Sequence, residues 1–251
     1  MQKLEEIELF GVKVTTSSEG SILKYIESKL EDSKSKTFIT TPNPEIIMYA
    51  RRHPEFMKIL NSADIALPDG VGVSMAASLT HKGKMTRITG VDFMERLCEK
   101  VSNSAIQNSK SVVSIGLFGG VPGIAEFTAE CLKKKYSGLV VSYASDTWKP
   151  HELKSKQVDI LFVAMGFPKQ EKWIYENLEK IPAKIVMGVG GSFDFISGKV
   201  GRAPKTVRNF GLEWLFRLVR QPWRLKRQLA LVGFILLTLK ETLRIASSKN
   251  T

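Results

Sequence analysis

The sequence predicts an α/β fold, a mostly parallel sheet with helices on both faces, and three observations support this prediction. Short, continuously apolar runs alternate along the chain with longer segments of helical periodicity, as in parallel sheets covered by helices on both faces. Of 251 residues, 43% are apolar and 25% are charged, a globular composition. Most of the net positive charge falls in the last 50 residues. The expected architecture is therefore a Rossmann-like, mostly parallel sheet followed by a basic helical C-terminal appendage.

The expected strands are short apolar runs bounded by Gly, Pro and polar turn residues. They are Thr37–Thr40, Asp64–Leu67, Val112–Phe118, Leu139–Tyr143, Asp159–Ala164 and Lys184–Val189. The expected helices lie between the strands and place apolar residues at helical spacing. They are Gly20–Leu30, Pro44–Leu60, Val71–Leu79, Val91–Val101, Pro122–Tyr136 and Pro168–Leu178.

Polar, glycine-rich or proline-rich turns follow five of these strands. They are Thr41–Pro44, Pro68–Gly70, Gly119–Gly123, Gly166–Glu171 and Gly190–Asp194. In open α/β sheets, ligands bind outside the carboxyl ends of the strands, where the strand order reverses. These turns therefore hold the candidate site residues.

Asp69 lies in the turn Pro68–Gly70. By itself Pro-Asp-Gly is an ordinary turn, but at the mouth of a parallel sheet a carboxylate can act as a general base toward a substrate hydroxyl. Thr41 and Asn43 follow a neighbouring strand and could orient that substrate. The alternative is that they cap the helix that begins at Pro44.

Gly119 and Gly120 lie in a glycine-rich segment, Gly116–Gly123, that follows a strand and opens a helix. Glycines let a phosphate or ribose approach the backbone, and a helix N-terminus supplies free N–H donors. The segment is neither a G-x-G-x-x-G fingerprint nor a P-loop. A nucleotide loop and a tight strand-to-helix turn, with Pro122 at the first helical position, therefore both stay open.

Two further turns carry polar candidates. Gly166 precedes Lys169 and Gln170, which begin a helix and could direct donors at the sheet edge. The alternative is a capped helix start with solvated charges. Asp194 follows Gly190–Ser192 and could accept a hydrogen bond from a ribose or a base, or could simply complement a helix dipole.

The sequence also lacks several signatures of metal or serine chemistry. It holds no Asp-x-Asp motif and no Gly-x-Ser-x-Gly elbow, and its three histidines, His53, His81 and His151, show no ligand spacing. We therefore expect no metal site and no cofactor.

The charge is unevenly distributed along the chain. Overall, 37 Lys and Arg against 25 Asp and Glu give +12, but residues 202–251 alone hold 11 basic and two acidic residues, or +9. A basic segment of this kind binds phosphates in a nucleic acid, an anionic membrane or a phosphorylated substrate.

Four arginines of this segment, Arg217, Arg220, Arg224 and Arg227, are spaced three, four and three residues apart. On a continuous helix they would form one stripe, although Pro222 is expected to break that helix.

An apolar run, Leu229–Leu239, follows the arginines, and Trp214 and Trp223 precede it. Its 11 residues are too few to span a bilayer, which takes about 20, and Met1–Phe10 resembles no signal peptide. Arginines, tryptophans and a short apolar run together favour contact with a membrane surface or a lipid diphosphate. The alternative is a helix that packs its apolar side on the body and leaves its arginines solvated.

Two other classes of protein would each explain part of the sequence. A nucleic-acid-binding protein would explain the basic segment, but not the apolar run or the five turns. An oxidoreductase with a Rossmann fold would explain the sheet, but the G-x-G-x-x-G fingerprint is missing.

Taken together, the segments resemble the WecG/TagA/CpsF glycosyltransferase family over about Ile7 to Leu231, close to its TagA branch. The matching segments are Thr41–Glu45, Leu67–Gly70, Arg87–Asp92, Gly166–Trp173, Gly188–Asp194, Arg202–Pro204, Gly211–Arg217 and Pro222–Arg224.

The resemblance implies an inverting, metal-independent transfer from a UDP-sugar to undecaprenyl-diphosphate-linked N-acetylglucosamine, in the synthesis of a cell-surface polysaccharide such as wall teichoic acid. N-acetylmannosamine is the expected sugar, and its uronic acid or a plain hexose the alternatives. The resemblance makes Asp69 the general base, puts Thr41 and Asn43 on the acceptor side, and assigns Gln170 to the donor's sugar or phosphates and Asp194 to its nucleoside. The residues expected over the diphosphates are Arg87, Arg217, Arg224 and Arg227.

The resemblance also sets an organisation for the chain. Residues 1–201 would form the catalytic body, and residues 202–251 an appendage that contacts an anionic membrane and completes the site. The protein would be cytoplasmic, peripheral on the inner face of the bacterial membrane, able to self-associate through its body and without a nucleic-acid partner. The turn at Gly119 and Gly120 departs from the family's small-residue turns, which leaves its role open.

Overall fold

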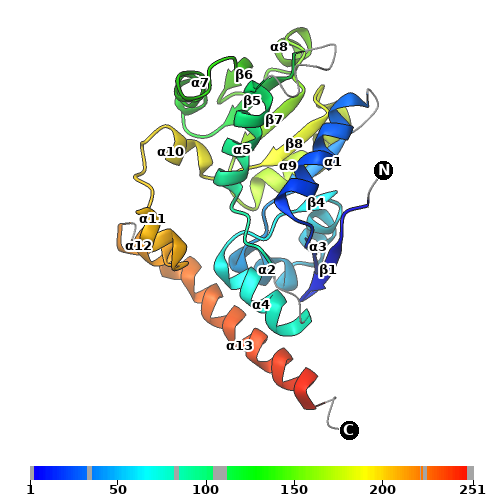
Figure 1. The fold of residues 1–251 in the computed structure, drawn as a ribbon, viewed down its shortest axis with the longest axis vertical. Coiled ribbons are helices and arrows are strands. Elements are labelled where there is room, and N and C mark those ends of the chain that lie inside the picture. The colour runs from blue at the N-terminus through cyan, green and yellow to red at the C-terminus, as the bar shows by residue number, and fades with distance from the viewer. Residues whose placement is uncertain are drawn as a thin grey trace.

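A computed structural model describes residues 3–32, 36–81, 85–103, 112–220, 222 and 225–247, except for the side chains at 209 and 226–228. Its centre is a six-stranded parallel sheet in the order β4-β3-β8-β7-β5-β6 (Figure 1). In chain order the strands are β3 (Thr37–Thr40), β4 (Ile65–Ala66), β5 (Ser114–Gly119), β6 (Val140–Ser145), β7 (Ile160–Ala164) and β8 (Ile185–Gly188). The predicted parallel sheet is confirmed.

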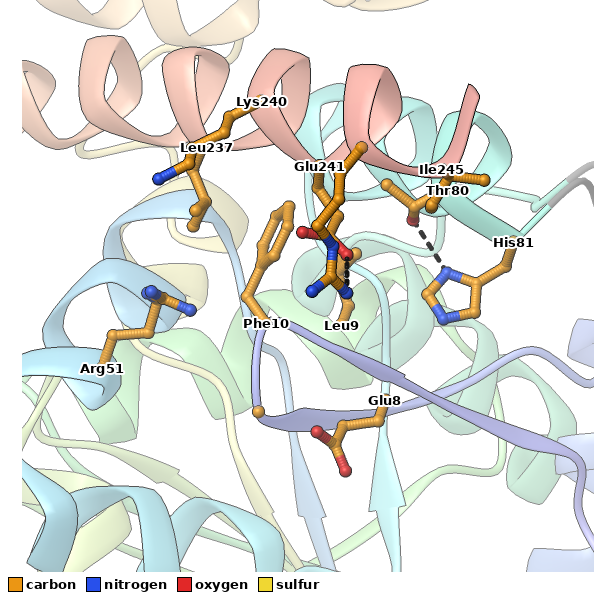
Figure 2. Close-up of a pocket in the computed structure, with 12 residues that line it drawn as sticks. Glu8, Leu9, Phe10, Arg51, Thr80, His81, Leu237, Lys240, Glu241 and Ile245 are labelled. Carbon is orange, nitrogen blue, oxygen red and sulfur yellow. Dashed lines mark hydrogen bonds and ion pairs between the residues drawn. The ribbon is translucent and has the colours of Figure 1, made fainter. Parts of the chain in front are cut away.

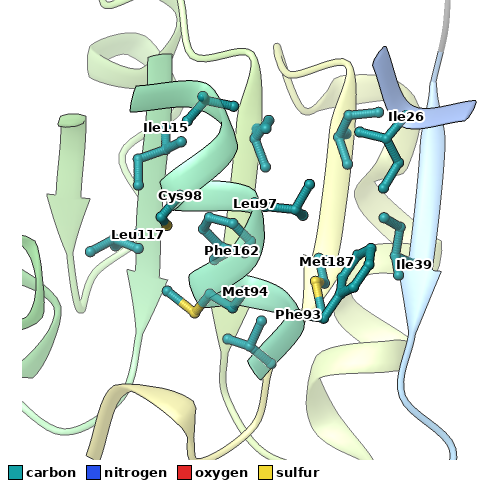
Figure 3. Close-up of a cluster of buried hydrophobic side chains, with 14 of the residues drawn as sticks. Ile26, Ile39, Phe93, Met94, Leu97, Cys98, Ile115, Leu117, Phe162 and Met187 are labelled. Carbon is teal, nitrogen blue, oxygen red and sulfur yellow. The ribbon is translucent and has the colours of Figure 1, made fainter. Parts of the chain in front are cut away.

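One face of the sheet is covered by α1 (Glu19–Glu31), α5 (Gly90–Ser102) and α7 (Ile124–Lys135). Figure 3 shows Phe93, Met94 and Leu97 of α5 packed over strand residues of this face, among them Phe162 and Met187. These side chains are almost fully removed from water, and burial of each stabilises the fold by roughly 1.5–3 kcal/mol.

The opposite face carries α8 (Pro150–Ser155), α9 (Lys169–Asn177) and the short helix η1 (Leu178–Lys180). Successive residues of β7 alternate between the two faces, since Phe162 belongs to the first cluster while Leu161 and Val163 belong to the second. Trp148 and Trp173 pack edge to face at 4.7 Å and close this second layer.

A third apolar cluster lies beyond the β4 edge of the sheet. It joins an antiparallel hairpin, β1 (Glu6–Leu9) and β2 (Val12–Thr15), to three helices, α2 (Pro44–Arg52), α3 (Pro54–Asn61) and α4 (Val71–His81). The hairpin turns at Phe10 and Gly11, which both adopt positive φ angles, as a two-residue hairpin turn requires.

The C-terminal segment is helical, as predicted. It comprises α11 (Lys205–Asn209), α12 (Glu213–Arg220) and α13 (Leu225–Ser247). The helix α13 runs along α2 and α4 (Figure 1), and its Phe234 is 1% exposed and packs edge to face on Phe10. Among the described residues, no helix is both long and apolar enough to cross a bilayer.

Two local predictions were wrong, and one element was not predicted. The helix expected over Pro44–Leu60 is two helices, because Pro54 has no N–H to continue the first one and α3 begins at it. The helix expected from Pro122 begins two residues later at Ile124, after Gly123 in a left-handed conformation. The hairpin was not predicted, although Leu9, Val12 and Val14 alternate with exposed charged residues in the period of two that marks a strand.

Candidate active site

The strand order brings three of the predicted turns together. Since β4, β3 and β8 are neighbours and all strands are parallel, the turns that follow them leave the same edge of the sheet side by side. Asp69 follows β4, Thr41 follows β3, and Gly190 follows β8.

Backbone hydrogen bonds hold Asp69 between two other loops. The Asp69 N–H donates to the carbonyl of Pro42 at 3.1 Å, and the Ile88 N–H donates to the carbonyl of Pro68 at 3.1 Å. The loop after β4 is therefore fixed both to the Thr41–Pro44 turn and to the segment that leads into α5.

The environment of Asp69 raises its pKa to about 7. Desolvation by burial is the largest cause, and the negative charge of Glu213 adds to it; Arg87 opposes the shift, as does Arg217, while Asp92 reinforces it. A carboxyl group whose pKa lies near neutrality is suited to take a proton at physiological pH. The arrangement can therefore supply a general base.

Thr41 and Asn43 lie beside this loop; Thr41 packs against the start of α5, and Asn43 caps α2. Thr41 is buried, and a methyl group placed on Gly90 at the start of α5 would lie 3.2 Å from its Cγ2. Asn43 caps α2, because its Oδ1 accepts a hydrogen bond from the Ile46 N–H at 3.0 Å. The capping alternative is thus confirmed for Asn43, and contact of either residue with a substrate stays a prediction.

A network of charged residues joins the start of α5 to the C-terminal segment. Arg202 Nη1 contacts Asp92 Oδ1 at 2.6 Å, and Arg202 Nε lies 3.5 Å from Glu213 Oε1. Burial acts to raise the pKa of Asp92, but the hydrogen bonds from Arg202 and Thr89 outweigh it and hold that pKa below its usual value. Asp92 is therefore a fixed negative charge near Asp69.

Arg87 connects the same region to α11. Its Nη1 donates a hydrogen bond to the backbone carbonyl of Arg208 at 3.2 Å, and its charge acts on Asp69. The segment Arg87–Asp92 and the C-terminal helices therefore enclose Asp69 together.

Gln170 is held by both ends of its side-chain amide. Its Oε1 accepts a hydrogen bond from the Gly190 N–H at 2.9 Å, and its Nε2 donates to Glu171 Oε1 at 2.8 Å. Gln170 and Glu171 are 2% and 1% exposed, and burial raises the pKa of Glu171. This clamp fixes the Gly190 turn to the first turn of α9.

Arg217 of α12 lies against the turn after β8. A methyl group placed on Gly191 would lie 3.0 Å from Arg217 Nη2 and 3.8 Å from Asp194 Oδ2. The guanidinium of Arg217 also stacks over the ring of Phe195 in α10 (Ser192–Ile196), 4.8 Å from its centroid. Arg217 and Asp194 therefore both lie next to Gly191, while the roles that the resemblance implies for them stay predictions.

Gly119 and Gly120 lie farther along the sheet edge, since β5 is separated from β4 by three strands, about 19 Å at the usual strand spacing. Gly120 has a φ of +86°, and a methyl group there would lie 2.1 Å from Ile124 Cγ2, so a tight turn into α7 requires glycine. Its N–H donates to the Ala164 carbonyl at 2.8 Å.

The remaining candidates are placed only in part. Gly166 lies two residues after the end of β7, and Lys169 is exposed at the first residue of α9. Arg224 lies outside the described residues, and of Arg227 only the backbone is described, within α13. Because α12 ends at Arg220 and α13 begins at Leu225, the four arginines are not on one continuous helix.

No role was predicted from the sequence for three charged residues that the structure places near Asp69. They are Asp92, Arg202 and Glu213. The ion pair between Asp92 and Arg202 links positions 110 residues apart, which no local pattern reveals. The one sign of these residues in the sequence is that they lie within the segments that match the family. Within the described ranges, no group of three or more His, Cys, Asp or Glu side chains is arranged to hold a metal ion.

The site places a carboxyl group with a pKa near neutrality close to two arginines, at the carboxyl edge of a parallel sheet. This arrangement suits an enzyme that transfers a group from a phosphorylated donor. Residues 7–248 match the model of the Glycosyl transferase WecG/TagA/CpsF family, and the chain belongs to that family. It is thus a glycosyltransferase and not an oxidoreductase.

Three similar proteins share one name. A protein of Bacillus subtilis (strain 168) is 33% identical over 239 residues, covering 93% of this chain and 91% of its own length. A protein of Bacillus spizizenii is 34% identical over 226 residues (88% and 85%), and one of Staphylococcus aureus (strain MRSA252) is 27% identical over 251 residues (97% and 96%). Each is named N-acetylglucosaminyldiphosphoundecaprenol N-acetyl-beta-D-mannosaminyltransferase.

Proposed function

We propose that this protein transfers N-acetylmannosamine from a UDP-sugar to undecaprenyl-diphosphate-linked N-acetylglucosamine, with inversion at the anomeric carbon, in the synthesis of a wall teichoic acid-like polymer. The names of its relatives support the sugar and the acceptor. The observation that carries the chemistry is Asp69, whose pKa is raised to about 7 at the meeting point of three loops and α12.

The proposed reaction is a single displacement. Asp69 takes the proton of an acceptor hydroxyl as its oxygen bonds to the anomeric carbon, and the bond from that carbon to the diphosphate breaks. UDP leaves with the bonding electron pair and gains negative charge. Thr41 and Asn43, next to Asp69 in the structure, hold the acceptor.

The donor occupies the turns that follow β5, β7 and β8. Gln170, through its clamp on the Gly190 N–H, keeps these turns in place for the sugar and phosphates, and Asp194 accepts from the nucleoside. The residues assigned to the donor are Gly119, Gly120, Gly166, Lys169, Gln170, Gly190, Gly191 and Asp194.

Arginines stabilise the diphosphates. The charges of Arg87 and Arg217 act on the carboxyl group of Asp69. They can therefore also stabilise the negative charge that the leaving diphosphate gains next to Asp69. The resemblance assigns Arg224 and Arg227 to the same diphosphates. Guanidinium groups can neutralise the leaving UDP, so we expect turnover without an added metal ion.

The chain divides by role into a catalytic body, residues 1–201, and an appendage, residues 202–251. The appendage supplies Glu213 and Arg217 to the site, and α13 exposes several large apolar side chains. A lipid-linked acceptor stays in its membrane, so we infer that the appendage holds the enzyme peripherally on the cytoplasmic face.

A donor screen tests this function. The purified protein is incubated with a short-chain lipid-diphosphate N-acetylglucosamine and either UDP-N-acetylmannosamine, the corresponding uronic acid donor or UDP-glucose, with and without a chelator. We expect the acceptor mass to grow by one N-acetylhexosamine with the first donor alone, chelator or not.

A lipid diphosphate without the sugar serves as the control acceptor and should gain no mass. Transfer from the uronic acid donor or UDP-glucose instead would refute the proposed sugar, and no transfer from any donor would refute the function. Loss of transfer in the chelator would contradict metal independence.

A further inference from the structure

A cavity of about 570 Å³ lies between the hairpin, the ends of α2 and α4, and the last turns of α13. The helices α2 and α4 begin at the turns of the candidate active site and end at this cavity. With 9 and 11 residues they are about 13 and 16 Å long. The cavity is therefore separate from the site around Asp69, at the opposite ends of two helices.

Three cations line the cavity from two distant parts of the chain. Arg51 comes from α2 and Lys240 from α13 (Figure 2). The third cation is Arg244, also of α13. Among the described residues, neither Arg51 nor Lys240 has a carboxylate within ion-pair distance, whereas Arg244 Nη2 contacts Glu241 Oε1 at 2.8 Å. Glu8, which is exposed, is the other acidic residue of the lining. The cavity thus has an excess of positive charge.

An apolar stripe borders these cations on α13. Its members follow one another at spacings of four, three, four, three and four residues, so they lie on one side of the helix, and each is more than half exposed: Leu225, Leu229, Val232, Leu236, Leu239 and Leu243. Since Lys240 and Arg244 line the cavity and the stripe does not, the two cations lie between the stripe and the cavity.

The walls of the cavity are held in place by packing. Phe10 of the hairpin contacts Phe234 of α13 edge to face, with ring centroids 5.4 Å apart, and points from the hairpin toward α13 in Figure 2. Gly233 lies so close to α2 that a methyl group there would be 3.1 Å from Met48 Cε. Arg51 of the body therefore faces Lys240 of the appendage across a preformed space.

We propose that this cavity binds the phosphate head group of an anionic phospholipid, whose acyl chains lie along the apolar stripe of α13. A phosphate pairs with Arg51 and Lys240, and the stripe gives the attached hydrocarbon a surface next to it. A small soluble anion would use the cations but not the stripe. The volume lies in the range of cavities that hold small ligands.

A bound lipid of this kind would join the body to the appendage. Its phosphate contacts α2 through Arg51 and α13 through Lys240 and Arg244, so a membrane would stabilise α13 in its packed position. The proposal rests on the membrane association proposed above and names the lipid class and the residues that recognise it.

The test compares Arg51→Gln and Lys240→Gln with the wild type and with Arg52→Gln. Arg52 is also exposed and is next to Arg51 in α2, but it does not line the cavity. Co-sedimentation is measured with vesicles of phosphatidylcholine alone or mixed with phosphatidylglycerol. We expect each cavity variant to lose about fivefold in partitioning to the mixed vesicles, with Arg52→Gln close to the wild type. Equal losses in all three variants would overturn the site, since they would indicate a diffuse surface charge.

Two further measurements separate the alternatives. Thermal unfolding in millimolar inorganic phosphate should be unaffected; stabilisation that Arg51→Gln removes, without any change in vesicle binding, would mean a soluble anion and refute the lipid. Transfer to a short-chain soluble acceptor should equal that of the wild type in both cavity variants, which also shows that they fold. If the wild type transfers sugar but Arg51→Gln and Lys240→Gln bind mixed vesicles like the wild type, the inference fails while the proposed function stands.

Discussion

Asp69→Asn is expected to lower kcat about 1000-fold while leaving UDP binding intact. An amide of the same shape cannot take the proton of an acceptor hydroxyl, and general-base catalysis contributes about 100- to 10,000-fold. The backbone hydrogen bond from Asp69 to Pro42 does not involve the side chain, so the loop should keep its position. Turnover is measured as lipid-linked product by mass spectrometry, and UDP affinity by titration calorimetry.

The matched control is Asp146→Asn. Asp146 follows β6, at the opposite edge of the sheet from β4, so its loss should leave turnover near that of the wild type. If Asp69→Asn turns over at a wild-type rate, Asp69 is not the base. If UDP affinity falls together with turnover, Asp69 acts by shaping the site.

Arg217→Ala is expected to lower kcat about 100-fold, because the leaving UDP would lose one of the charges that stabilise it. Arg217→Lys should recover part of this loss, since a lysine keeps the charge but not the paired donors of a guanidinium. Arg217 also acts to lower the pKa of Asp69. Arg217→Ala should therefore move the acidic limb of the pH–rate profile to higher pH.

Arg220→Ala is the control for this variant. Arg220 is in the same helix, and its guanidinium lies 4.8 Å from the centroid of the Phe216 ring. Unlike Arg217, it is not among the charges that shift the pKa of Asp69. Equal losses in Arg217→Ala and Arg220→Ala would indicate a general effect on α12. A normal kcat in Arg217→Ala would remove it from the site.

The sheet could be predicted because its strands carry strong local signals. Runs such as Ile160–Ala164 are buried on both faces and therefore read as continuous apolar segments between helices. The hairpin was missed because its strands alternate apolar with charged or polar residues over only four positions each, which is a weaker signal than the continuous apolar runs of the central sheet. The break at Pro54 depends on one residue that lacks an N–H.

Only the part of the candidate site that lies directly after the strands could be predicted from the sequence. Asp69, Thr41 and Gly190 follow strands, and parallel strands bring such positions to one edge. The charges that set the pKa of Asp69 come from elsewhere, since Glu213 and Arg217 approach from α12. Which distant helix closes over an edge depends on tertiary packing, and no spacing within the sequence encodes it.

The pH dependence of kcat/KM tests most directly the claim that Asp69, next to the charges of Glu213 and Arg217 from the appendage, is the base. Only the deprotonated carboxyl accepts a proton, so kcat/KM should rise tenfold per pH unit below a midpoint of about 7 and level off above it. Because the charge of Glu213 helps to raise this pKa, Glu213→Gln should move the midpoint to lower pH. A midpoint near the ordinary carboxyl value of 3.8, or one that Glu213→Gln leaves in place, would contradict the account.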